Sequence, residues 1–190
     1  AFNAANAAAD GRQILVPEGV YYISDTVSMI NEVVFDGTVT MPDTARLTLR
    51  HGFHLNTYID AFGDEVLGFK KAIQALFYYS DHDSLDLCGR RIEIDEPIDV
   101  AVVSGASTLE VRRVIRNGQI NIQASSNWDV EVMTSAGSYN AASPRQMTNV
   151  TNIANIKVGS LVTGTGVGRE VYVQAVNVGA QTLTLSQPLY

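Results

Sequence analysis

The acidic residues between Glu93 and Asp99 are the side chains whose types and spacing could do chemistry. Cleavage of a glycosidic bond needs two carboxyl groups about 5–9 Å apart across one groove, one of them with a raised pKa. Alternate residues on the outer face of one strand could supply such a pair. Asp95, Glu96 and Asp99 are the catalytic candidates on this reasoning, and Asp86 lies near them in sequence. The alternative is that these acids are solvated surface groups and nothing more.

Aromatic side chains suggest a second kind of site, because the faces of sugar rings pack against aromatic rings. Tyr78 and Trp128 are the glycan-binding candidates, since they are less committed to an expected core face than Phe77 is. Packing in the core or between subunits is the favoured interpretation of both.

The three histidines do not predict a metal site. His51 and His54 lie three residues apart, and His82 stands between Asp81 and Asp83. Zinc needs three or four converging ligands, and the sequence has no second cluster of His or Cys. The two aspartates lack the distal glutamate of a calcium loop. We therefore expect no metal and no other cofactor.

The glycines from Gly164 to Gly168 have the look of a phosphate-binding loop. Such a loop requires a strand before it and a helix after it. The residues that follow, Arg169 to Val173, instead alternate in polarity as a strand does. The pattern predicts a hairpin turn.

Composition narrows the classes of partner and fold. The chain has 190 residues, 46% of them hydrophobic, and a net charge of −7. That charge argues against nucleic acid as a partner. Cys88 is the single cysteine, so no internal disulfide is expected. No stretch approaches the ~20 apolar residues of a membrane span, so we expect no membrane insertion. The chain begins without methionine and ends directly after a strand-like run, and we expect it to be a piece of a longer protein.

The elements that must position these residues are short strands and two helices. Residues 1–29 read as a small helix, a strand, a turn at Pro17–Gly19 and a second strand. Residues 64–79 show helical spacing of apolar side chains. We further predict strands at residues 97–100 and 128–132. The expected domains are a helix-capped β block at 1–63, a helix with β coils at 64–134, and a small all-β module, possibly inserted, at 135–190.

The first strand–turn–strand unit carries a resemblance. Val16, Pro17, Gly19 and Tyr21 match the x-Val-Pro-x-Gly-x-Tyr pattern that follows the capping helix in bacteriophage tailspikes. The run Ala72-Ile73-Gln74-Ala75-Leu76 also resembles the helices that precede the coils of those proteins. The resemblance implies a mostly β fold that starts a right-handed parallel β-helix of the pectate-lyase type. Short helices cap it, and a small all-β module follows at the C-terminal end.

The resemblance also implies a function and a setting. The expected function is the structural and receptor-binding part of a virion-associated spike that recognises bacterial surface polysaccharide. The implied assembly is a homotrimer in contact with other virion proteins, on the tail or head of a phage-like particle. One alternative is a polysaccharide-degrading hydrolase or lyase whose catalytic coils lie mostly beyond Tyr190. A second alternative is a non-viral adhesin or secreted glycan-binding protein.

Overall fold

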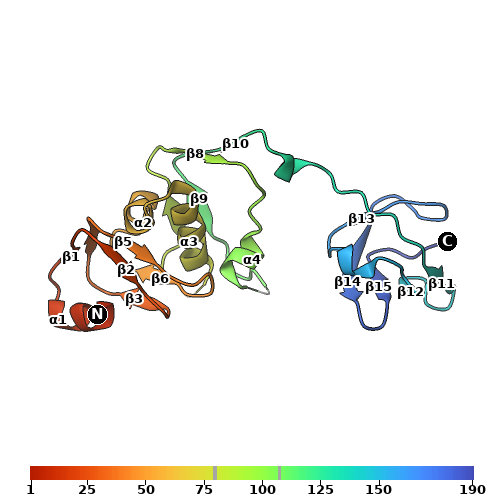
Figure 1. Ribbon diagram of the computed structural model, residues 1–190, viewed down its shortest axis with the longest axis horizontal. Coiled ribbons are helices and arrows are strands. Elements are labelled where there is room, and N and C mark those ends of the chain that lie inside the picture. The colour runs from red at the N-terminus through yellow and green to blue at the C-terminus, as the bar shows by residue number, and fades with distance from the viewer. Residues whose placement is uncertain (79–80, 107) are drawn as a thin grey trace. The chain divides into compact units, whose positions relative to one another are not determined.

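The protein is described by a computed structural model that covers residues 1–78, 81–106 and 108–190. The chain divides into two compact units, Ala1–Asp129 and Val130–Tyr190 (Figure 1). Each unit has its own cluster of buried apolar side chains. In the described residues, none of the helices is long and apolar enough to cross a membrane.

The first unit begins with a helix and three pairs of parallel strands. Helix α1 spans Phe2–Ala9 and ends at Asp10, whose φ of 48° is left-handed. Three strands then follow one another, and three more pair with them in the same order, β1 with β4, β2 with β5 and β3 with β6. Their bounds are β1 Ile14–Val16, β2 Val20–Tyr22, β3 Val27–Met29, β4 Val33–Phe35, β5 Thr38–Thr40 and β6 Leu47–Leu49. Alternate side chains of these strands point inward and form the core.

Two helices follow the sixth strand. Helix α2 spans Leu55–Phe62 and helix α3 spans Glu65–Phe77, with Gly63 between them at a φ of 68°. The Asp64 carboxylate accepts a hydrogen bond from the Leu67 amide and so caps α3. The helix predicted at residues 64–79 is confirmed over its described part, and Tyr79 lies outside the described residues.

The rest of the first unit contains two more parallel pairs and a short helix. Strand β7 pairs with β9, and β8 pairs with β10. The bounds are β7 Ser84–Asp86, β8 Arg91–Ile94, α4 Val100–Ser104, β9 Val114–Arg116, β10 Gln119–Ile122 and the 3-10 helix η1 Ser126–Trp128. The strand predicted at residues 97–100 is wrong, because the Asp99 carboxylate caps the start of α4. The strand predicted at residues 128–132 is also wrong, because those residues join no sheet.

The second unit is an antiparallel sheet that curls into half a barrel. Its strand order is β11-β12-β15-β14-β13. The bounds are β11 Ser138–Tyr139, β12 Gln146–Thr148, η2 Ile153–Asn155, β13 Leu161–Val162, β14 Val171–Asn177 and β15 Thr182–Leu185. Val162 pairs with Val171, so the glycine-rich residues 163–170 connect two antiparallel strands. The predicted hairpin turn is confirmed.

The prediction of a mostly β, right-handed parallel β-helix is wrong. Parallel strands in the described chain occur only as two-stranded pairs, and the largest sheet is antiparallel. The content is 21% helix and 27% strand, which does not fit a stack of β coils. Helices α2 and α3 follow β6 and separate the first three parallel pairs from the pairs β7–β9 and β8–β10 in the chain.

Beside β6, other side chains take the hydrogen bonds that a third strand would use. The Arg46 carbonyl accepts from the Val27 amide, so in a parallel ladder the backbone groups of Leu47 point away from β3. The Tyr58 hydroxyl on α2 donates to the Leu47 carbonyl at 2.8 Å, in a fully buried position. The imidazole of His82 lies 2.9 Å from the carbonyl of Leu49, the next residue that faces this edge.

A buried lysine ties α3 to the loop before β6. Lys71 is only 5% exposed. Its ammonium group donates to the carbonyls of Pro42 at 2.9 Å and Ala45 at 2.8 Å, and the Gln74 amide donates to the Asp43 carbonyl at 2.6 Å. These bonds satisfy a loop that would otherwise bury unpaired carbonyls under the helix.

Replacement of Lys71 tests this tether. We expect Lys71→Met to lower the unfolding free energy of the first unit by roughly 2 to 4 kcal/mol, because buried carbonyls lose their donor. Lys70→Met is the matched control, since in the described part of the chain the neighbouring Lys70 forms an exposed ion pair with Glu96. Urea unfolding followed by Trp128 fluorescence reports the first unit, because Trp128 is the single tryptophan. Equal losses in the two variants would contradict the tether.

Lys71 also makes the unfolding free energy depend on pH in the alkaline range. Burial lowers the pKa of its ammonium group from the ordinary 10.5, while the Asp43 carboxylate opposes this shift. Between the lowered pKa and 10.5 the unfolded chain binds a proton that the folded chain has released, so the unfolding free energy rises with pH. We expect the stability difference between wild type and Lys71→Met to grow as the pH approaches 10.5. Tyr58 is present in both proteins and cancels, and a difference constant with pH would refute the assignment.

Candidate functional site

The three acids nominated as catalytic lie around the turn after β8 and at the start of α4. The Lys70 ammonium group donates to Glu96 at 2.5 Å, and this bond lowers the pKa of the Glu96 carboxyl group. Asp99 accepts from the amides of Ala101 at 2.9 Å and Val102 at 3.1 Å, as a helix cap does. Asp95 is exposed in the turn. Two of the three acids therefore hold structural partners.

The two aromatic candidates also take part in packing. The Arg46 guanidinium carbon lies 3.6 Å from the centre of the Tyr78 ring, a cation–π contact. Trp128 packs against the main core, and its indole N–H donates to the Gln123 carbonyl at 2.9 Å. Both rings are half-buried.

The three histidines lie in different local environments. His54 precedes α2, and its Nδ1 accepts from the Thr57 amide at 3.4 Å. His82 stacks on Phe53 with ring centres 4.4 Å apart. His51 lies on the exposed surface. Over the described ranges, no group of three or more His, Cys, Asp or Glu is placed to hold a metal ion.

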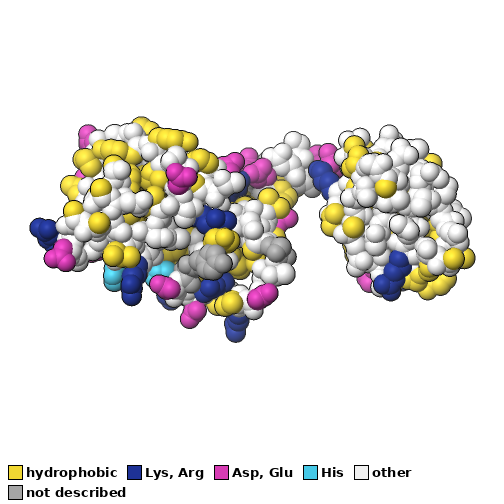
Figure 2. Space-filling view, turned by 90° about the horizontal axis from the view of Figure 1, so that it is seen from below, with side chains coloured by type: hydrophobic (Ala, Val, Ile, Leu, Met, Phe, Trp, Pro, Cys, Tyr) yellow, Lys and Arg dark blue, Asp and Glu magenta, His cyan; other side chains and the backbone are white. Residues whose placement is uncertain are grey.

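Two cavities among the described residues are lined by other side chains than the nominated acids. One, of about 320 Å³, lies in the second unit between β12 and β15 and is lined in part by Arg145. The other, of about 120 Å³, lies beside β3 and β6 and is lined in part by Arg50 and His82. Charged side chains of both signs are interspersed with apolar ones over the face drawn in Figure 2, without a large patch of one sign.

The arrangement that sequence reasoning missed is the outward face of β8 and β10. In the parallel register Glu93 lies opposite Asn121. The Glu93 carboxylate accepts from the Asn121 amide at 2.6 Å, from the Gln123 amide and from Arg91 Nε at 3.1 Å. We call these four residues, Arg91, Glu93, Asn121 and Gln123, the polar face. Amide, carboxylate and guanidinium groups on one face can bind the hydroxyl groups of a sugar.

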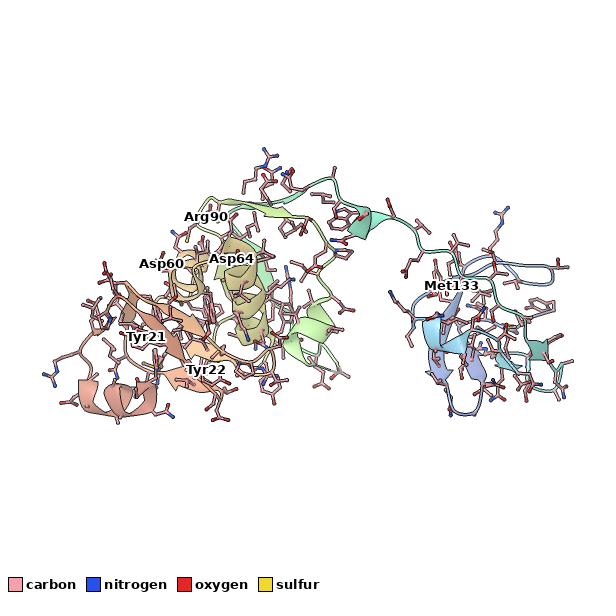
Figure 3. The ribbon with its side chains drawn as sticks, in the orientation of Figure 1. Tyr21, Tyr22, Asp60, Asp64, Arg90 and Met133 are labelled. Atoms are coloured by element: carbon pink, nitrogen blue, oxygen red, sulfur yellow. The ribbon has the colours of Figure 1, made fainter. Side chains whose placement is uncertain are left out.

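The polar face is anchored to the helices through the turn before β8. Arg90 extends from this turn toward α2 and α3, where Figure 3 also labels Asp60 and Asp64. Its Nε donates to Asn56 at 2.5 Å, and its guanidinium group lies 3.3 Å from the Glu65 carboxylate. The period-two alternation of each strand was visible in the sequence. The pairing of β8 with β10 was not, because it joins residues about 28 positions apart.

The hydrogen bonds of the polar face can be tested by titration of Glu93. The amides of Asn121 and Gln123 stabilise the charged carboxylate and hold its pKa below the ordinary 4.5. We expect a Glu93 pKa below that value in a carbon-13 NMR titration, and a rise toward it in Asn121→Ala/Gln123→Ala. Gln174→Ala, an exposed amide on β14, is the control and leaves the titration unchanged. A Glu93 pKa that is insensitive to the double variant would exclude the network.

Comparison of the chain with sequence profiles of protein families, with curated proteins and with solved structures finds no match. Function must therefore be inferred from the chain's own residues and their contacts.

Proposed function

We propose that this chain is a structural, receptor-binding part of a virion-associated spike that recognises bacterial surface polysaccharide. The observation that carries the proposal is that most side chains nominated for chemistry already hold partners within the fold. Glu96 binds Lys70, Asp99 caps α4, and Trp128 donates to the backbone of Gln123. The Val16-Pro17-x-Gly19-x-Tyr21 pattern supports the spike assignment through its resemblance to tailspikes.

The motif has a defined structural task in this chain. Pro17 and Gly19 form the turn between β1 and β2, and Gly37 packs directly against it. A Cβ atom at Gly37 would lie 2.2 Å from the Pro17 carbonyl, so this position requires glycine. The ring of Phe2 on α1 packs edge-on against the ring of Tyr21, with 6.4 Å between the ring centres. The motif thus joins the first helix to the first two strand pairs, as a structural role requires.

Catalysis by the chain's own acids has less support. A glycosidase needs a general acid that stays protonated near neutral pH, and hence a raised pKa. The carboxyl groups of Asp86, Glu93 and Glu96 instead have lowered pKa values, each because of hydrogen bonds to its charged form. These three acids are therefore anionic at neutral pH and suit binding better than proton donation.

The polar face is the surface that we assign to polysaccharide. Arg91 and Glu93 keep 59% and 40% of their side chains exposed, so both can reach a ligand. Sugar hydroxyl groups both donate and accept, which matches the mixture of donors and acceptors on this face. In the spike, we propose that copies of the chain assemble as a homotrimer beside other virion proteins.

Binding to a panel of purified capsular and lipopolysaccharides tests the proposal. We expect the chain to bind at least one polymer and to leave its length unchanged on incubation. Asn121→Ala/Gln123→Ala should weaken binding at least tenfold, because two donors of the polar face are lost, while Gln174→Ala binds as the wild type does. Shortening of the polymer would favour the enzymatic alternative. Absence of binding across the panel, together with absence of the chain from purified particles by mass spectrometry, would refute the proposal.

A further inference from the structure

Strand β10 has a free edge. The amides of Gln119 and Gln123 donate to carbonyls of the β8 side, so these residues and Asn121 face β8. In a parallel ladder the residues between them, Ile120 and Ile122, point their backbone N–H and C=O groups the other way. In the described chain β10 pairs with β8 alone. The outer edge of β10 can therefore accept a further strand.

The side chains beside this edge are apolar and uncovered. Ile120 and Ile122 lie in register with Ile92 and Ile94 of β8 and point to the same side of the pair. Ile92 is fully buried and Ile94 is 8% exposed, whereas Ile120 is 46% and Ile122 is 63% exposed. Ile92 and Ile94 belong to the main buried core, whereas no described segment covers Ile120 and Ile122. An apolar row beside an unpaired strand edge is typical of a site for strand addition.

The same chain carries a segment with the matching pattern. Val130 is 87% exposed and Val132 is 83% exposed, with Glu131 between them. This Val-Glu-Val alternation matches Ile120-Asn121-Ile122 residue for residue, and β-branched side chains favour strands. The segment belongs to no sheet and is followed by Met133, which is labelled in Figure 3. It has the composition of a strand without a partner.

Chain length selects a second copy as the donor. The strand pairs described in the first unit are all parallel, so the added strand is placed in parallel, with Val130 beside Ile120. Within one chain only residues 123–129 separate β10 from Val130, and a parallel return needs a dozen residues or more. A parallel pairing of the segment with β10 therefore requires another molecule.

We propose that β10 binds the Val130–Val132 segment of a second copy of this chain as an added parallel strand. Each copy donates one strand and accepts one, and such head-to-tail contacts close into a ring when the rotation permits. The proposal deepens the proposed function, since it rests on the chain being an assembled spike component and names the partner and the surface. The polar face lies on the opposite side of β10 and stays free for ligand.

The test is reciprocal mixing of two double variants. Ile120→Lys/Ile122→Lys removes the acceptor, and Val130→Asp/Val132→Asp removes the donor. All four positions are exposed, so each variant should keep the wild-type circular dichroism spectrum. Val158→Asp/Val178→Asp, at exposed valines elsewhere in the second unit, is the control. By light scattering after size-exclusion chromatography, wild type and control should be oligomeric and each double variant monomeric. An equimolar mixture of the two should form 1:1 pairs, because each supplies what the other lacks.

A cross-link gives a second readout. In a Cys88→Ser background, an Ile122→Cys chain mixed with a Val132→Cys chain should form a disulfide between molecules, and a Val158→Cys chain should not. A monomeric wild type, a donor variant that assembles normally, or an acceptor variant that assembles normally would each overturn the proposal. A monomeric wild type that still binds polysaccharide would refute strand addition and leave the proposed recognition of polysaccharide standing. Oligomers that bind none would refute recognition alone.

Discussion

The first unit depends on how the backbone carbonyls at the end of its strand pairs are satisfied. An unpaired buried carbonyl costs about 1–3 kcal/mol, so helices cannot pack on a bare strand edge without donors. Tyr58 and Lys71 supply those donors from α2 and α3, to Leu47 and to the loop before β6. Lys71 is desolvated by the same packing, as its lowered pKa reflects. The carbonyl bonds that compensate the lysine are therefore the bonds that position α3.

The outer edge of β10, in the later strand pair β8–β10, lacks such donors in the described chain. Helix α3 contacts β6 of the earlier strand pairs and β7 and β8 of the later ones. Among the described residues β10 pairs with β8 alone, and its isoleucines stay exposed next to its free edge. The edge of β6 is thus closed by polar side chains, whereas the edge of β10 has apolar side chains and open hydrogen-bonding groups. The first terminates pairing, and the second invites it.

Local patterns in the sequence predicted local structure well and long-range pairing poorly. The apolar spacing was sufficient for α3, and alternation after Gly168 was sufficient for the hairpin, because neighbouring residues determine both. The β-helix prediction failed since the number of stacked strands depends on which side chain reaches a carbonyl, as Tyr58 reaches Leu47 across 11 residues. The strand predicted at residues 97–100 failed because one carboxylate, Asp99, bonds two amides and favours a helix start.

The candidate site shows why acidic residues alone predict chemistry poorly. Glu93 and Glu96 have different partners. Side-chain amides next to β8 donate to Glu93, whereas Lys70 of α3 donates to Glu96. Those partners are 26 to 30 residues away and lower the pKa of both acids. Strand alternation then separates two tasks on β10, because Asn121 points to the polar face while Ile120 and Ile122 point to the apolar row. A ligand and a neighbouring copy can therefore use the same three-residue stretch without competing for a side chain.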